Sequence, residues 1–330
     1  MEKSCIVCVT GGTGYIGSWL VKKLLEKGYT VHATLRDLKN ESKVGLLKSL
    51  PHAEARLVLF EADLYNPNEF VSAIQGCEFV FHVATPLQHQ SGSEYKNMVE
   101  AAVAGSKSIA ESCIRAGTVR RLIYTGSVVA ASPLKDDGSD FKDSVDETCW
   151  TPLNASISHL LHGEYIYSKT LIEKDMLSYG NRLEVVSLSL GLVGGDTLQS
   201  FLSGSMVAMV SQLTGNRNGY QSLKCLEELL GKIPLVHVDD AGEAHVFCME
   251  NPSINGRFLV ASSYISSQDI AAYYLTHHPE LQVKLEYVQG PKREIDYGST
   301  KLTDKGFVYK YDTKKILDGC IGCARRTGDL

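Results

Sequence analysis

The sequence of 330 residues lacks any hydrophobic run long enough to cross a membrane. A membrane-spanning helix needs about 18 or more consecutive apolar residues. The apolar run Cys5–Val9 is far shorter and leads directly into a glycine-rich turn. It is also too short for the hydrophobic segment of a secretory signal peptide. We therefore expect a cytosolic protein that makes no membrane contact.

An excess of positive charge is also missing. The chain has 33 Lys and Arg against 38 Asp and Glu, for a net charge of −5. Nucleic-acid-binding proteins normally carry a basic patch or stripe. Adjacent arginines occur only at Arg120–Arg121 and Arg325–Arg326, and such pairs are typical of a solvated surface. The charge pattern therefore predicts no nucleic-acid partner.

The cysteines do not form the pattern of a disulfide framework or a metal centre. Their number is nine, which is odd, and free thiols are the norm in a reducing cytosol. Of the two CxxC pairs, Cys5 and Cys8 fall in a predicted strand, where residues three apart point to opposite faces. The second pair is Cys320 and Cys323. Polar residues near His237 fit a strand end and a helix start better than a metal cluster. We predict no metal site.

Internal repeats and low-complexity segments are absent, and the first 190 or so residues alternate between strand and helix patterns. The predicted strands are nearly continuous apolar runs, as expected for strands buried on both faces. They are Ser4–Thr10, Thr30–Arg36, Arg56–Glu61, Phe79–Val83, Arg121–Thr125 and Glu184–Leu190. This alternation predicts an α/β fold with a doubly wound, Rossmann-type parallel sheet.

Beyond Gly195 the regular alternation of strand and helix patterns ends, which indicates a second, smaller domain. We expect a dinucleotide-binding domain over residues 1–193 and 234–262, and a substrate-binding domain over residues 194–233 and 263–330. Within the latter part of the chain the pattern predicts a helix at Asp196–Leu213, a polar loop at Thr214–Lys232, strands at Leu235–Val238 and Arg257–Ala261, a helix at Ser266–His278 and a mixed tail.

A glycine-rich segment joins the first predicted strand to the first predicted helix. Gly11, Gly14 and Gly17 have GxxGxxG spacing. Glycines at these places allow a tight turn, a close approach to a pyrophosphate and close packing of the helix on the sheet. The helix N-terminus would then face the phosphates. The predicted cofactor-binding residues of this loop are Thr10, Gly11, Gly12, Thr13, Gly14, Tyr15, Ile16 and Gly17.

The residues at the ends of the next strands favour NADPH over NADH. The second strand ends at Arg36 rather than at the acid that NAD sites usually place there. A guanidinium forms bidentate bonds to a 2′-phosphate, and Lys43 would assist it. Strand carboxyl ends bind ligands in this architecture. We therefore add Asp63, Leu64, Val83, Ala84 and Thr85 to the predicted cofactor contacts.

Three further residues have the chemistry for reducing a carbonyl. Tyr165 and Lys169 are four apart in a predicted helix, so both lie on one face. A neighbouring ammonium lowers the pKa of a phenol and makes it a usable proton donor. Ser127 follows a core strand, where its hydroxyl would bond the same substrate oxygen. Tyr167 points to another side of the helix and is rejected.

These motifs resemble the extended short-chain dehydrogenase/reductase family, and within it the plant dihydroflavonol reductase and anthocyanidin reductase group. The resemblance covers essentially the whole chain. It rests on TGGTGYIG at Thr10–Gly17, EADL at Glu61–Leu64, FHVATP at Phe81–Pro86, LIYTGS at Leu122–Ser127, DETCW at Asp146–Trp150, YxxxK at Tyr165–Lys169, VHVDD at Val236–Asp240 and KLTDKGFVYKY at Lys301–Tyr311.

The resemblance implies a role for each candidate. Ser127 would orient the substrate oxygen, Tyr165 would be the general acid, Lys169 would bind the nicotinamide ribose, and Arg36 would select NADPH. The implied activity is NADPH-dependent reduction of a carbonyl or related unsaturated centre in a flavonoid-like plant secondary metabolite. A monomer or weak homo-oligomer is expected. The segment Gly215–Lys232 looks more like that of anthocyanidin reductases.

The substrate stays open at this point, because the chain departs from the group near the expected pocket. Gly126, Leu190, Ser132 and the segment 161–164 differ from the group's usual residues. The predicted pocket residues are Pro86, Ser132, His162 and Met206. Alternatives are a reductase of a non-flavonoid ketone or aldehyde, a nucleotide-sugar epimerase or dehydratase, which Arg36 argues against, and a non-enzymatic NADPH-binding protein, which would typically have lost part of the Ser, Tyr and Lys set.

Overall fold

The computed structural model describes residues 5–87, 89–153, 162–290, 293 and 295–330. The chain divides into two compact units. The first unit comprises Met1–Gly126, Tyr167–Leu188 and Gly242–Phe258. The second comprises Ser127–Ile166, Ser189–Ala241 and Leu259–Leu330. No helix in the described part of the chain is both long and apolar enough to span a membrane.

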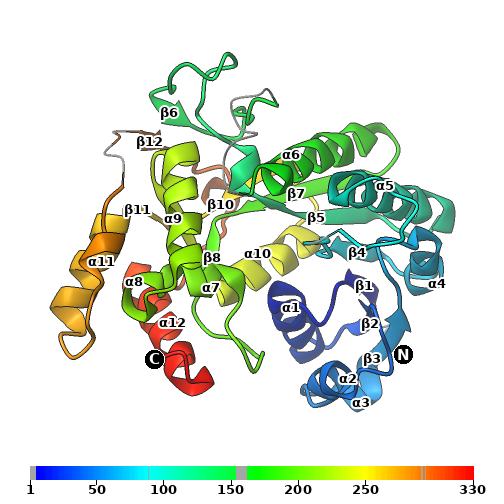
Figure 1. The fold of residues 1–330 in the computed structure, drawn as a ribbon. Coiled ribbons are helices and arrows are strands. Elements are labelled where there is room, and N and C mark those ends of the chain that lie inside the picture. The colour runs from blue at the N-terminus through cyan, green and yellow to red at the C-terminus, as the bar shows by residue number, and fades with distance from the viewer. Residues whose placement is uncertain (1–4, 88, 154–161, 291–292, 294) are drawn as a thin grey trace. The chain divides into compact units, whose positions relative to one another are not determined.

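A seven-stranded sheet, to which the first unit contributes most strands, confirms the predicted doubly wound architecture (Figure 1). Its order is β10-β7-β5-β4-β1-β2-β3. The strands are β1 (Ile6–Thr10), β2 (Thr30–Leu35), β3 (Leu57–Glu61), β4 (Phe79–His82), β5 (Arg121–Ser127), β7 (Glu184–Leu190) and β10 (Gly256–Val260). The order reverses direction at β1, where β4 pairs on one side and β2 on the other, both in parallel. Ligands bind at such a switch point in open α/β sheets.

Helices cover this sheet, as the alternation of strand and helix patterns predicted. They are α1 (Tyr15–Glu26), α2 (Glu41–Lys48), α3 (Ala53–Arg56), α4 (Phe70–Ile74), α5 (Met98–Ala116), α6 (Gly163–Ser178) and α10 (Val238–Glu250). One core cluster joins α4, α5 and α6 to the strands through residues such as Phe70, Ile109 and Ile172. All three side chains are almost completely buried, which is the main stabilising contribution in such a layered fold.

Shorter strands and further helices build the second unit. One small sheet has the order β11-β9-β8, with β8 (Leu192–Gly194), β9 (Ile233–His237) and β11 (Ser263–Ile265). A second small sheet pairs β6 (Ser144–Val145) with β12 (Asp296–Tyr297). The helices are α7 (Gly204–Met209), α8 (Ser211–Thr214), α9 (Arg217–Leu230), α11 (Ser267–His277) and α12 (Thr313–Thr327).

The sequence prediction was wrong for two segments of this unit. The predicted single helix at 196–213 is two short helices, α7 and α8, and α7 begins only where Ser203 caps it by accepting from the N–H of Met206. The predicted loop at 214–232 contains α9, which packs beside α7 (Figure 1). Asn216 caps the start of α9 and Gly231, with a positive φ of 80°, ends it.

Candidate active site

The glycine loop forms the tight turn that a bound pyrophosphate requires. Gly11 has a φ of +67°, a backbone conformation that other residues rarely adopt. A Cβ atom at Gly17 would lie 2.2 Å from the carbonyl oxygen of Gly11, so only glycine fits there. The N–H of Gly12 donates to the Thr34 carbonyl at 2.8 Å, which ties the loop to β2. This loop therefore offers its backbone to a ligand at close range.

The first turn of α1 contains no side chain that would repel or replace a negatively charged ligand. Its N-cap is Gly14, which provides no side-chain hydrogen bond, and the first turn contains no acidic residue. Side chains do cap the helices α5, α9, α11 and α12. Uncapped N–H groups at a helix start attract phosphate through hydrogen bonding and the helix dipole. The glycine loop and this helix end together fit the diphosphate of a dinucleotide.

The Thr10 side chain links the start of the glycine loop to the segment that follows β4. Its Oγ1 accepts from the N–H groups of Val83 and Ala84, each at 3.0 Å, and it lies 3.1 Å from Nδ1 of His82. Nε2 of His82 lies 2.8 Å from Ser106 Oγ. Burial is the main reason that the pKa of His82 falls to about 3, with the charge of Lys169 adding to it. His82 is thus a neutral core histidine with a partner at each ring nitrogen.

The other predicted cofactor contacts lie at strand ends in the first unit. Arg36 follows β2 directly and is exposed, as is Lys43 on α2. Asp63 follows β3 and its carboxylate accepts from the N–H of Tyr65 at 3.1 Å. Leu64 is buried against Gly105. The two cations are therefore accessible to a ligand, whereas Leu64 packs in the core.

Lys169 is a buried ammonium with fixed partners. Its side chain is 4% exposed. Its Nζ donates to Thr85 Oγ1 at 2.9 Å and to the Thr125 carbonyl at 3.0 Å. Burial lowers the pKa of Lys169 to about 8, and the charge of Glu173 acts in the opposite direction. Near neutral pH this lysine is charged but close to its titration range.

Ser127 and Tyr165 form a hydrogen-bonded pair. Ser127 ends β5, and Tyr165 lies in the first turn of α6, four residues before Lys169. Burial raises the pKa of Tyr165, and its hydrogen bond to Ser127 lowers it in part. We expected Lys169 to lower this pKa, but burial has the largest effect, so the phenol stays protonated. A protonated phenol beside a serine hydroxyl suits proton donation to an oxygen atom.

The four predicted pocket residues have different environments. Pro86 is half-buried and His162 is exposed, with its Nε2 3.0 Å from Ser222 Oγ of α9. Ser132 is fully buried, and its hydroxyl donates to the Leu229 carbonyl at the end of α9. Met206 is also fully buried. The sequence position of His159, shortly before Tyr165, also makes it a pocket candidate, but it lies outside the described residues.

Helix α9 places residues beside Tyr165 that the sequence prediction missed. Tyr165 packs against a cluster that includes Val128, Cys225 and Leu229. The signal was present in the spacing of Leu223, Leu226 and Leu230, three or four residues apart, between Asn216 and Gly231. A polar composition concealed this amphipathic pattern. The helix therefore shapes the surroundings of the candidate proton donor.

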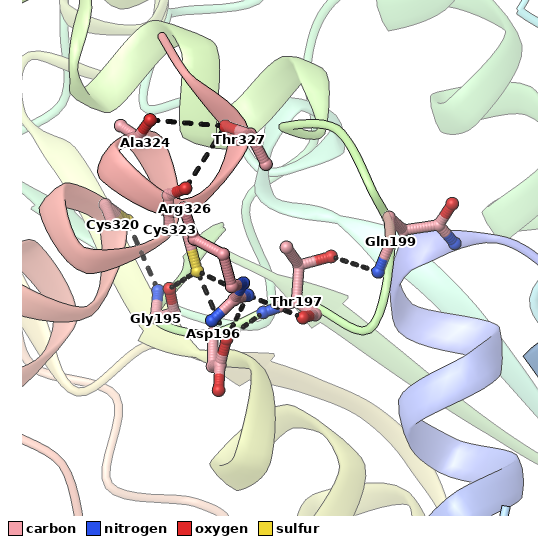
Figure 2. Close-up of polar contacts among 9 residues, drawn as sticks. All are labelled: Gly195, Asp196, Thr197, Gln199, Cys320, Cys323, Ala324, Arg326 and Thr327. Carbon is pink, nitrogen blue, oxygen red and sulfur yellow. Dashed lines mark hydrogen bonds and ion pairs between the residues drawn. The ribbon is translucent and has the colours of Figure 1, made fainter. Parts of the chain in front are cut away.

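The C-terminal CxxC pair packs on the segment that follows β8. Figure 2 shows Asp196, Cys323 and Arg326 converging beside Gly195. Cys323 Sγ lies 3.2 Å from Asp196 Oδ1, and the N–H of Gly195 lies 3.3 Å from Cys320 Sγ. All nine cysteines are free thiols. In the described part of the chain no group of three or more His, Cys, Asp or Glu residues is arranged to hold a metal.

Comparison with known proteins places this geometry in context. The sequence matches the NAD dependent epimerase/dehydratase family over residues 7–261. It is 36% identical to a dihydroflavonol 4-reductase of Solanum lycopersicum, over 98% of this chain and 83% of the relative. It is 34% identical to the vestitone reductase of Medicago sativa, over 98% of each chain. The crystal structure of alfalfa vestitone reductase superposes with a TM-score of 0.81, covering 98% of this chain and 99% of that one.

Proposed function

Because the chain belongs to the NAD dependent epimerase/dehydratase family, we propose that it is an NADPH-dependent reductase of a flavonoid-like plant phenolic. One observation carries the proposal most directly: Tyr165 is hydrogen-bonded to Ser127, and Lys169 follows one turn later on the same helix. The relatives named above, a dihydroflavonol reductase and a vestitone reductase, support this substrate class.

The residues of the first unit fit the cofactor. The glycine loop and the start of α1 would hold the diphosphate, since the glycines of the loop carry no side chain and the N-cap Gly14 provides no side-chain hydrogen bond. Arg36 and Lys43 would bind the 2′-phosphate of NADPH. Lys169 would bind the nicotinamide ribose. NADPH supplies the hydride, and the protein supplies binding and orientation.

The chemistry proposed for this chain is proton transfer to the substrate oxygen. Ser127 holds the oxygen through its hydroxyl, and Tyr165 donates the proton as negative charge develops on that oxygen. The buried ammonium of Lys169 stabilises the phenolate that remains. Stabilising the phenolate needs Lys169 charged, so the pKa of about 8 places the working range at neutral pH or below.

A substrate panel tests the function. NADPH oxidation would be followed with dihydroflavonols, anthocyanidins, isoflavanones and simple aromatic ketones or aldehydes. We expect turnover of at least one flavonoid class. Turnover of the simple carbonyl compounds alone would point to a reductase of another class, whereas tight NADPH binding without turnover would point to a binding protein.

Cofactor choice is tested separately with Arg36→Ala. We expect weaker binding of NADPH and unchanged binding of NADH, because only NADPH carries the 2′-phosphate. An equal loss for both cofactors would contradict the assignment of Arg36. Lys43→Ala should show the same selectivity with a smaller loss.

We also propose that the protein is cytosolic and is a monomer or weak homo-oligomer. The first point is supported by the absence of a membrane-spanning helix among the described residues. Light scattering behind size-exclusion chromatography, over a range of protein concentrations, tests the second. The domain boundaries predicted from the sequence likewise stay a proposal, and limited proteolysis would test them.

A further inference from the structure

A carboxylate lies buried one helical turn beyond Lys169. Glu173 is on α6, four residues after Lys169, so the two side chains share a face of the helix. Glu173 is 0% exposed. Carboxylates are almost never fully buried unless they are paired. The complete burial of Glu173 therefore has to be explained by the groups that it contacts.

Two neighbours fix both oxygen atoms of Glu173. Ser187 of β7 donates to Oε1 at 2.5 Å. Arg257 of β10 donates to Oε2 at 3.0 Å, and its own side chain is only 5% exposed. Removing such a pair from water often costs more free energy than the attraction between its two charges returns. A contribution to stability is therefore a weak explanation for this buried pair. Both contacts hold the Glu173 carboxylate in place, one helical turn after Lys169.

Several described groups around the Lys169 ammonium carry no negative charge. Its hydrogen-bond partners are the hydroxyl of Thr85 and the carbonyl of Thr125. The ring of Tyr124 lies 5.2 Å from Nζ. His82 is neutral, because burial lowers its pKa to about 3. Nε2 of His245 lies 2.8 Å from Oγ1 of Thr125, the residue whose carbonyl accepts from Lys169. The Glu173 carboxylate, by contrast, favours the charged form of Lys169.

We propose that Glu173, held by Ser187 and Arg257, is a positioning residue that keeps the Lys169 ammonium charged for cofactor binding and reduction. The proposal rests on the proposed function for its catalytic consequence. The electrostatic part of the proposal concerns only the charge of Lys169 in the folded protein and does not depend on the reaction. Without Glu173, burial acts alone and Lys169 loses its proton at a lower pH.

The direct test is a titration of Lys169 by NMR. Lysine would be labelled with ¹³C at Cε, and the Lys169 signal assigned by its loss in Lys169→Arg. We expect the midpoint to fall by about one pH unit or more in Glu173→Gln, since an opposite charge nearby shifts a pKa by that order. Glutamine keeps a hydrogen-bonding partner for Ser187 while removing the charge. An unchanged midpoint in the folded variant would overturn the proposal.

Two controls separate charge from structure. Ser187→Ala keeps the anion and should leave the Lys169 midpoint near that of the wild type. Glu173→Gln combined with Arg257→Gln removes the charge that Glu173→Gln alone leaves unpaired. The double variant should regain thermal stability over Glu173→Gln yet keep the lowered midpoint. A midpoint that returns to the wild-type value together with stability would show a purely structural role and overturn the proposal.

Enzyme kinetics then test the link to the reaction. The alkaline limb of the kcat profile should move down with the NMR midpoint in Glu173→Gln, with about tenfold less activity one pH unit above that midpoint, as expected for one required proton. An NMR shift without any shift of the kcat profile would count against the proposed role of Lys169 in reduction. It would leave the electrostatic effect of Glu173 on Lys169 established.

Discussion

The two units of the molecule each contain an arginine–carboxylate pair, and the pairs differ in their surroundings. In the first unit, Arg257 and Glu173 are 3.0 Å apart with side chains 5% and 0% exposed. In the second, Arg326 and Asp196 are 2.7 Å apart with side chains 53% and 51% exposed. The exposed pair is the shorter one. Distance alone therefore does not rank the two pairs, and burial decides what each contributes.

The difference is one between buried and solvated polar groups and not between the units as a whole, since the proposed proton donor Tyr165 lies in the second unit. In the first unit, buried polar groups such as Thr10, His82 and Lys169 are fixed by several partners. In the second, Asp196 and Arg326 link the C-terminal helix to the segment after β8 at the surface (Figure 2). Fixed, desolvated groups suit catalysis, because their charges act strongly at short range. Solvated pairs mainly secure chain segments.

The largest stability effect is expected when the buried pair is broken. Arg257→Gln should lower the free energy of unfolding by about 3–5 kcal/mol, because it leaves the Glu173 carboxylate buried without its cation. Urea unfolding followed by circular dichroism measures the change. Adding Glu173→Gln should recover much of the loss. A loss below about 1 kcal/mol would mean that the pair behaves like a surface pair.

The next largest effect is expected at the glycine loop. Gly17→Ala places a Cβ atom 2.2 Å from the Gly11 carbonyl oxygen, so the loop must shift. We expect about 1–3 kcal/mol of destabilisation, as for other overpacked sites, and loss of measurable NADPH binding in calorimetry. Gly204→Ala in the second unit is the matched control, because no atom lies within 4 Å of its added Cβ. Equal effects of the two substitutions would contradict the packing argument.

NADPH affinity should depend on pH through Lys169. Its pKa of about 8 means that the ammonium is present below that pH and is lost as the pH rises through it. We expect the Kd for NADPH to rise above pH 8, by up to about tenfold per unit for one titrating group. Fluorescence titration from pH 6.5 to 9.5 measures it. Lys169→Arg should bind more weakly but with a flat profile, because arginine stays charged.

The smallest effect is expected for the exposed pair. Arg326→Ala should change the free energy of unfolding by about 0–1 kcal/mol, because water and salt screen the charges. The same urea experiment used for Arg257→Gln gives a direct comparison. A loss as large as that of the buried pair would show that Arg326 contributes mainly through its contacts with Thr197 and Cys323.

Sequence patterns predicted the first unit better than the second. Buried parallel strands such as Glu184–Leu190 are continuous apolar runs, and the structure places β7 at those residues. Helix α9 was missed because its buried residues alternate with charged ones and its segment reads as polar. Helix α12 was missed in the tail for the same reason, although Asp312 caps it and Gly328 ends it.

The candidate site shows the same limit. The glycine loop and the Tyr165–Lys169 spacing follow from local sequence, because each lies within a few residues. The role of Glu173 could not be predicted, since its partners Ser187 and Arg257 lie on distant strands. The buried environment of Ser132 could not be predicted either, because it depends on the end of α9. Long-range packing decides which polar residues are fixed, and one sequence alone does not reveal it.

The central claim, proton donation by Tyr165, is tested most directly by comparing Tyr165→Phe with Tyr167→Phe. Tyr167 lies two residues away on the same helix and is 39% exposed, so it controls for loss of a phenol hydroxyl. With the best substrate of the panel, the account predicts that Tyr165→Phe lowers kcat by about 10²–10⁴-fold while NADPH binding persists, and that Tyr167→Phe behaves as the wild type. A Tyr165→Phe enzyme with a kcat close to that of the wild type would contradict it.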